Sequence, residues 1–100
     1  MKRYKVRILP SAYSDISSAR DWYRQYNLDL PLKFTQQLKF SVEQIRTTPY
    51  SHTLRYKNVR IANLKVFPYA VHYFIENDTI IIIAVHHAAI SPDKWKNRVK

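Results

Sequence analysis

The sequence predicts an α+β fold with the element order β-α-α-β-β-β, in which a helical hairpin packs on one face of an antiparallel sheet. Apolar residues recur at three- and four-residue steps in two stretches of the first half, as in amphipathic helices. The second half contains alternating stretches, two of which flank an Asn-Asp dipeptide, which indicates a hairpin of strands. One hundred residues fit a single domain, expected to span residues 1–100.

The first half of the chain is expected to contain one strand and two helices. The strand covers residues 4–9, where Tyr4, Val6 and Ile8 alternate with basic residues. Pro10-Ser11 ends the strand and begins a helix, because serine is a good N-cap. The apolar stripe of this first helix consists of Ala12, Ile16, Ala19, Tyr23 and Tyr26. After a break at residues 27–29, Pro31 fits the first turn of a second helix, whose stripe consists of Phe34, Leu38, Val42 and Ile45.

The second half is expected to form three strands, over residues 60–66, 69–76 and 79–86, after a linker at residues 51–53. Asn77-Asp78 can adopt the positive φ values of a tight turn, so the last two strands should pair as an antiparallel hairpin. Because side chains alternate across a strand, each face of the sheet can be assigned. The face predicted under the helices carries Leu64, Val66, Val71 and Ile75, and the face predicted to stay open carries Asn63, Lys65, Ala70 and His72.

Composition narrows the possible functions. The chain has 17 Lys and Arg against 7 Asp and Glu, a net charge of +10, which favours an anionic partner such as nucleic acid, the ribosome or an acidic protein. It has no glycine, which excludes phosphate loops and dinucleotide-binding turns. It has no cysteine, and its four histidines lie apart from clustered carboxylates, so we expect no metal and no cofactor. With neither a signal peptide nor a membrane span apparent, we expect a cytoplasmic protein.

Several motifs follow one another in the second half. Arg60 precedes a strand, Phe67-Pro68-Tyr69 is followed by Tyr73, an isoleucine-rich strand leads to His87, and Pro92 and Trp95 come last. In this order the sequence resembles the RelE/ParE family of small bacterial toxins, and it is closer to the ParE-like branch. The resemblance covers nearly the whole chain. It implies the toxin component of a type II toxin–antitoxin (plasmid stabilisation) system, neutralised by a cognate acidic antitoxin.

The resemblance leaves three functions open. ParE-like members bind DNA gyrase and need no catalytic constellation, whereas RelE-like members are ribosome-dependent mRNA endonucleases (mRNA interferases) that use Arg, Lys, Tyr and in some cases Glu or His. A third possibility is an inactive toxin-like binding module. Ala70 and Ile90 occupy positions where many active RelE-like relatives carry arginine, which favours the first or third function.

Candidate site residues follow from the same motifs and from the open face of the sheet. The candidates for catalysis are Lys65, His72, His87 and Arg98, of which the two histidines are possible general bases. The candidates for partner binding are Arg60, Lys65, Tyr69, Trp95 and Arg98. Arg60 is also a candidate for a structural ion pair with Asp15 or Glu43, and Trp95 is expected to pack at the edge of the core.

Overall fold

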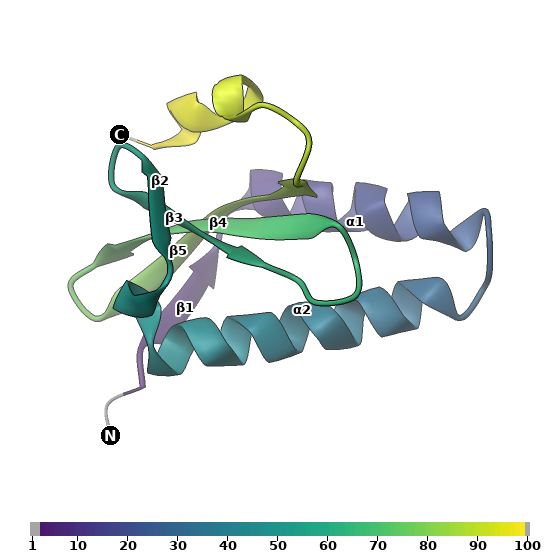
Figure 1. Ribbon diagram of the computed structural model, residues 1–100, viewed down its shortest axis with the longest axis horizontal. Helices are drawn as coiled ribbons and strands as arrows, with labels where there is room; N and C mark the ends of the chain where they lie inside the picture. Colours follow the sequence, from purple (N-terminus) through teal and green to yellow (C-terminus); the bar gives the residue numbers. More distant parts are fainter. Residues whose placement is uncertain (1–2, 100) are drawn as a thin grey trace.

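The computed structural model describes residues 3–99 and confirms the predicted order of elements (Figure 1). Strand β1 is followed by the hairpin of helices α1 and α2, and four further strands complete the sheet. The bounds are β1 Lys5–Ile8, α1 Pro10–Arg24, α2 Leu30–Thr47, β2 Thr53–Tyr56, β3 Val59–Asn63, β4 Tyr69–Glu76 and β5 Thr79–His87. Three short 3₁₀ helices are η1 Pro49–Ser51, η2 Pro92–Lys94 and η3 Lys96–Arg98. Strand β2 lies at the end of the expected linker and is an addition to the predicted set.

The sheet has the strand order β1-β5-β4-β3-β2. The β3–β4 and β4–β5 pairs are antiparallel, as predicted, and the added strand β2 pairs antiparallel with β3. Strand β1 adds a parallel edge to them, because it pairs with β5 from Lys5 opposite Thr79 to Ile8 opposite Ile82. Asn77 adopts a φ of 57° in the β4–β5 turn, which confirms the hairpin expected at Asn77-Asp78. In a chain without glycine, Lys57 (φ 48°) takes the same left-handed conformation between β2 and β3.

The helices cover one face of the sheet and form the larger core with it. Both apolar stripes enter this core, and strands β3 to β5 contribute residues such as Leu64, Val71, Tyr73 and Ile82. Two expected core residues lie at the surface instead. Val66 is 72% exposed because β3 ends at Asn63 and the chain turns away before it. Tyr26 is 66% exposed because α1 ends at Arg24.

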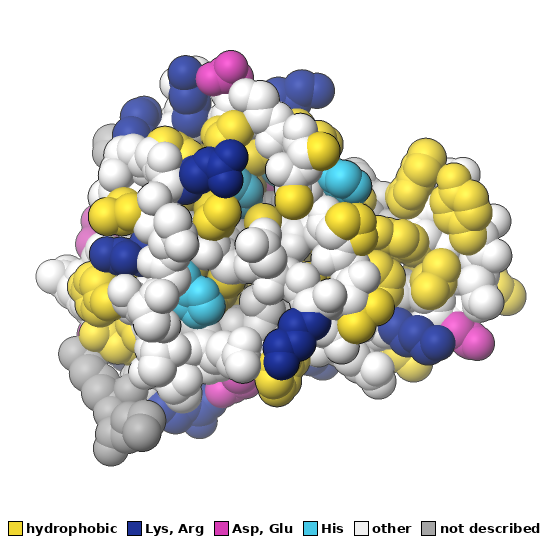
Figure 2. Space-filling model, viewed as in Figure 1, with side chains coloured by type: hydrophobic (Ala, Val, Ile, Leu, Met, Phe, Trp, Pro, Cys, Tyr) yellow, Lys and Arg dark blue, Asp and Glu magenta, His cyan; other side chains and the backbone are white. Residues whose placement is uncertain are grey.

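The tip of the helical hairpin carries an exposed apolar patch. Figure 2 shows hydrophobic side chains gathered at the end of the molecule that Figure 1 assigns to the α1–α2 connection. Its large exposed members are Trp22, Tyr26, Leu28 and Leu32. Trp22 and Tyr26 pack edge to face, with ring centroids 5.6 Å apart. Within residues 3–99 no helix combines the length and the apolar character that a bilayer span requires.

A second, smaller core lies on the other face of the sheet. Residues 88–99, named here the C-terminal segment, return over this face and bury Trp95 and Val99 against it. The sheet contributes Val59, Ile81, Ile83 and Ala84 to this cluster. The face that was predicted to stay open is therefore partly covered, because the last residues of the chain supply an aromatic side chain that the sheet can bury.

Replacing Tyr73 by phenylalanine is expected to reduce the free energy of unfolding by about 1–2 kcal/mol. The buried hydroxyl of Tyr73 donates a 2.6 Å hydrogen bond to the carbonyl of Pro49, and burial raises the pKa of Tyr73 to about 12. The substitution leaves that carbonyl without its donor. Urea unfolding followed by circular dichroism measures the loss. Tyr13→Phe, at an exposed position, is the control, and equal stability of both variants would contradict the prediction.

Candidate functional site on the sheet face

Trp95 fixes the C-terminal segment to the sheet. Its side chain is only 1% exposed, and its indole stacks on His86 with ring centroids 4.1 Å apart. The indole Nε1 donates a 3.3 Å hydrogen bond to Nδ1 of His72. The expected packing of Trp95 against the core is therefore confirmed. In this conformation Trp95 covers His72 and is itself too buried to contact a partner.

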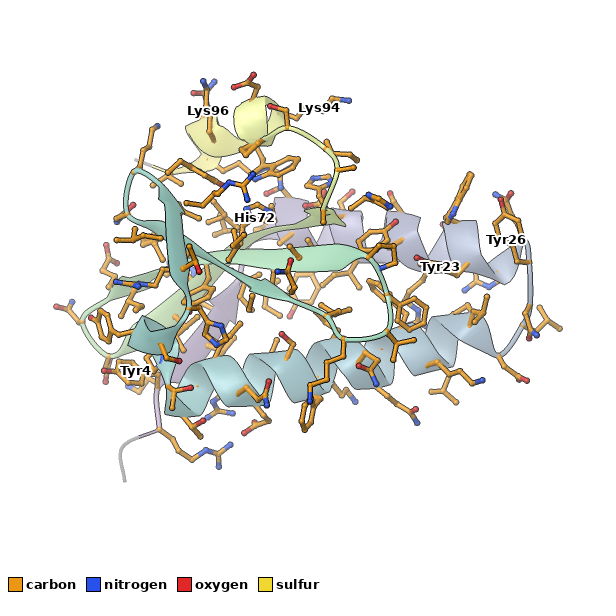
Figure 3. All side chains as sticks on the ribbon, in the orientation of Figure 1. Tyr4, Tyr23, Tyr26, His72, Lys94 and Lys96 are labelled. Carbon is orange, nitrogen blue, oxygen red and sulfur yellow. The ribbon has the colours of Figure 1, made fainter. Side chains whose placement is uncertain are left out.

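His72 lies beneath the C-terminal segment (Figure 3) and is only 6% exposed, so the expectation that it lies on an open face is corrected. Burial is the main reason that the pKa of His72 falls to about 4. Nearby basic groups lower this pKa further, and the carboxylate of Asp15 opposes them. The groups that lower it are His86, Arg55 and Arg98. The ring is consequently neutral near pH 7.

The contacts of His72 also determine its tautomer. An indole N–H can only donate, so Nδ1 of His72 must be the accepting nitrogen. The hydroxyl of Tyr56 lies 3.3 Å from the same nitrogen. The proton of the neutral ring is thus on Nε2, which can donate a hydrogen bond but cannot take a proton from a substrate. This arrangement argues against His72 as a general base.

The stability of the protein should decrease as the pH falls from 6.5 towards 4. In this window the unfolded chain binds a proton at His72 that the folded chain excludes, because the pKa in the fold is about 4. At about 1.4 kcal/mol per pKa unit, the total loss should be at most about 3 kcal/mol. Urea unfolding measured across this pH range should show the slope. His72→Asn, which cannot titrate, should lack most of it, and an unchanged slope would contradict the assignment.

Asp15 on α1 anchors the other end of the C-terminal segment. Its Oδ2 accepts hydrogen bonds from Arg98 Nη1 at 2.8 Å and from the backbone N–H of Val85 at 3.1 Å. His86 Nε2 lies 3.2 Å from the same oxygen, outside hydrogen-bond geometry. Burial raises the pKa of Asp15, but the contacts with His86, Arg98 and Val85 outweigh it and hold the pKa below its usual value. Arg98 also donates to the carbonyl of Ile83 at 2.8 Å, so it joins the segment to both α1 and β5.

Arg60 and Lys65 lie away from this cluster. Arg60 donates to the carbonyls of Tyr50 and His52 at 3.2 and 2.7 Å. These contacts with the loop before β2 replace the expected pair with Asp15 or Glu43. Lys65 is exposed and its ammonium lies 5.4 Å from the ring centroid of Phe40.

Tyr69 and His87 face each other across β4 and β5. They are register partners, and their ring centroids are 5.7 Å apart. Tyr69 also packs on Tyr23 and Phe34 in the larger core, and burial raises its pKa. Nδ1 of His87 accepts from the backbone N–H of Ala89 at 3.1 Å. The structure therefore brings Tyr69 and His87 together, and separately His72 and Trp95, but the four candidates for catalysis do not meet at one point.

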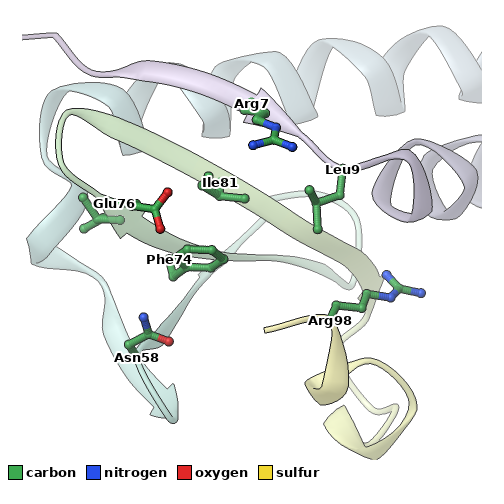
Figure 4. A pocket seen from close by; sticks show the side chains of 8 residues that line it. Arg7, Leu9, Asn58, Phe74, Glu76, Ile81 and Arg98 are labelled. Carbon is green, nitrogen blue, oxygen red and sulfur yellow. The ribbon is translucent and has the colours of Figure 1, made fainter. Parts of the chain in front are cut away.

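The C-terminal segment leaves two cavities beside it on the sheet face. The first, about 350 Å³, lies towards β1 (Figure 4) and is lined by residues that include Arg7, Leu9, Phe74, Glu76, Ile81 and Arg98. The second, named here the β3–β4 cavity, has a volume of about 200 Å³. Its lining includes Arg55, Asn63, Ala70, His72 and Ile90. Residues 3–99 contain no group of three or more His, Cys, Asp or Glu side chains placed to hold a metal ion.

A larger groove runs between the two helices on the opposite face. This interhelical groove has a volume of about 560 Å³. Apolar side chains of α1, α2 and β5, such as Ile16, Leu38 and Val85, form most of its lining. Arg20, Lys39 and Glu43 are the charged residues that border it. The sequence did not single out this groove, since the same apolar stripes also predict a closed core.

Comparison with known proteins identifies the family. The sequence-family model described as the ParE toxin of type II toxin–antitoxin systems (parDE) matches residues 6–92. No curated protein matches the chain significantly.

Two examples illustrate the solved structures that share the fold. A chain of the chromosomal ParDE toxin–antitoxin system from P. aeruginosa is 16% identical with a TM-score of 0.76, over 85% of this chain and 96% of that chain. A chain of the RelBE2 toxin–antitoxin complex from Mycobacterium tuberculosis is 20% identical with a TM-score of 0.58, over 85% of this chain and 98% of that chain. At these identities the two structures support the fold, and the match over residues 6–92 shows the family. The chain belongs to the ParE toxin family of type II toxin–antitoxin systems.

Proposed function

We propose that this protein is a cytoplasmic toxin that acts by binding its target, DNA gyrase, and that a cognate acidic antitoxin neutralises it. The proposal that the toxin acts by binding and not by catalysis depends on one observation, which is that two candidate catalytic side chains are already engaged within the protein. His72 is buried and neutral with its accepting nitrogen occupied, and Arg98 is held by Asp15 and Ile83. Phosphodiester cleavage needs a base and cations that converge on one phosphate. Binding to gyrase makes no such demand.

The interhelical groove supports the antitoxin part of the proposal. Its apolar lining suits the apolar face of an amphipathic segment, as in other helix-in-groove complexes. The net charge of +10 and the two basic residues on the border, Arg20 and Lys39, complement an acidic partner. Opposite charges would speed association and the buried apolar side chains would hold the complex. An antitoxin segment that folds on binding could cover such a groove.

Reversing a charge at the groove should weaken antitoxin binding. Lys39→Glu places a negative charge on the border of the groove, and we expect about a tenfold higher Kd for the acidic product of the adjacent upstream reading frame. Lys33→Glu makes the same change on α2 outside the groove and is the matched control. Isothermal titration calorimetry measures both variants. Equal weakening by both would place the antitoxin elsewhere, and no complex with the unchanged protein would count against an antitoxin.

The target is tested by two parallel assays with the purified protein. Inhibition of gyrase supercoiling, together with DNA damage as the first effect of induced expression, is the expected result. Codon-dependent mRNA cleavage on translating ribosomes would instead show the RelE-like activity. If neither assay responds and expression leaves growth unchanged, the chain is an inactive binding module. His87→Ala is expected to retain gyrase inhibition, because the proposal assigns no chemical step to this side chain.

A further inference from the structure

The polar groups that line the β3–β4 cavity are predominantly hydrogen-bond donors. They belong to Arg55 on β2, Asn63 on β3 and His72 on β4, and apolar residues such as Ala70 and Ile90 form the rest of the lining. None of the described residues that line the cavity carries a carboxylate. The side chain of Arg55 is exposed and forms no ion pair or hydrogen bond within residues 3–99. A ligand that supplies acceptor atoms would complement this lining.

His72 gives a second and independent reason to expect such a ligand. Its Nδ1 is occupied by Trp95 and Tyr56, which leaves the proton on Nε2. Nε2 has no hydrogen-bond partner among residues 3–99, and although the side chain is only 6% exposed, this nitrogen is not among the buried atoms left without a partner. It is therefore open to the cavity that His72 lines. A carboxylate placed in the cavity would accept a charge-assisted hydrogen bond from it.

We propose that the β3–β4 cavity binds a carboxylate group of an acidic polypeptide segment, with the Arg55 guanidinium and the His72 Nε2–H as donors. The volume of about 200 Å³ accommodates one acidic side chain and is below the 300–1,000 Å³ typical of sites for larger ligands. One cation beside neutral donors suits a monoanion better than the more highly charged backbone of a nucleic acid. The short side chain of Ala70 leaves the space that the carboxylate occupies. The inference rests on the proposed function only for the partner that supplies this carboxylate.

Acetate is the probe for the cavity itself. The full chain labelled with ¹⁵N is titrated with sodium acetate, with sodium chloride at equal ionic strength as the reference, and the imidazole resonances are followed by NMR. We expect the His72 Nε2–H proton to move downfield with saturation. Arg55→Gln should raise the apparent Kd at least about fivefold, because a charge-assisted hydrogen bond is lost. Arg7→Gln removes one positive charge that is also exposed and lies at the other cavity, and it should leave the Kd within a factor of two.

His72→Asn removes the Nε2 donor and keeps an amide oxygen near the position of Nδ1 for the indole of Trp95. We expect this variant to lose the saturable shifts of the cavity residues Asn63 and Ala70. Circular dichroism checks the fold of this variant. If it does not fold, the test depends on Arg55→Gln, which should fold because Arg55 is exposed. An unmoved His72 Nε2–H resonance in the unchanged protein, or equal effects of Arg55→Gln and Arg7→Gln, would overturn the inference.

The class of partner is tested with two polymers, a poly-glutamate of about twenty residues and a poly-uridylate of similar charge. Arg55→Gln should weaken the binding of poly-glutamate at least about threefold more than Arg7→Gln does. The two variants should weaken the binding of poly-uridylate equally. The reverse pattern would overturn the carboxylate assignment in favour of phosphate. If the cavity fails these tests while the upstream product still binds, the inference falls and the proposed function stands. If the cavity passes while no upstream product binds, the antitoxin proposal falls and the carboxylate site stands.

Discussion

Trp95→Ala is expected to lower the free energy of unfolding by about 3–5 kcal/mol, the usual cost of removing a large buried aromatic side chain. Trp95 is 1% exposed and fills the space between His72 and His86. The substitution opens that space and removes the indole that donates to His72 Nδ1. Urea unfolding followed by far-ultraviolet circular dichroism measures the change. The smaller core should be lost first, because Trp95 is its largest member.

Trp22→Ala is the matched control for this prediction. Trp22 is the other tryptophan of the chain and is 51% exposed at the hairpin tip, so we expect a change below about 1 kcal/mol. Trp22→Phe leaves Trp95 as the single tryptophan, whose fluorescence then reports directly on the C-terminal segment. Equal destabilisation by Trp22→Ala and Trp95→Ala would show that the C-terminal segment contributes little to the fold.

Asp15→Ala is expected to cost about 3 kcal/mol, the lower end for breaking a buried ion pair, because Arg98 keeps some contact with solvent. The alanine leaves Arg98 and the N–H of Val85 without the oxygen to which both donate. Since the pKa of Asp15 lies below its model-peptide value of 3.8, this stabilisation is present above pH 3.8 and is lost as the pH falls further. Thermal unfolding at neutral pH measures the cost.

Asp21→Ala controls for the loss of a helix carboxylate. Asp21 pairs with Arg24 at 2.6 Å on the exposed side of α1, and such surface pairs contribute only about 0–1 kcal/mol. The stability of Asp15→Asn should lie between those of Asp15→Ala and Asp21→Ala, because the asparagine amide oxygen still accepts one hydrogen bond. If Asp15→Ala unfolds at the same temperature as Asp21→Ala, the anchor to α1 is not a determinant of stability.

The order of elements was predictable because each signal is local. The stripes of α1 and α2 recur within a few residues, and Asn77 marks its turn through the backbone conformation that it tolerates. Strand β2 was missed because its four residues lie at a sheet edge and are mostly exposed, so they show no alternation of burial. The parallel pairing of β1 with β5 was missed because it joins segments far apart in the sequence.

The site was less predictable than the fold. Alternation along β4 correctly placed His72 on the opposite face of the sheet from Val71 and Tyr73. It could not show that Trp95 would cover His72. Arg98 was singled out as a cation for a target, whereas its ion pair joins it to Asp15, 83 positions earlier in the chain. No local pattern contains such a pair. Asp15 carried one usable signal, since it lies next to Ile16 in a helix whose apolar face must contact the sheet.

The pairing of β1 with β5 has a consequence for biosynthesis. Residue 5 finds its partner only when residue 79 is available, so the sheet has a high contact order and should close late in folding. The helical hairpin depends on nearer neighbours and can form while translation continues. Until β5 arrives to supply Ile82 and Val85, the apolar sides of both helices remain accessible on the nascent chain. A partner that binds the helices could therefore meet them before synthesis of the chain is complete.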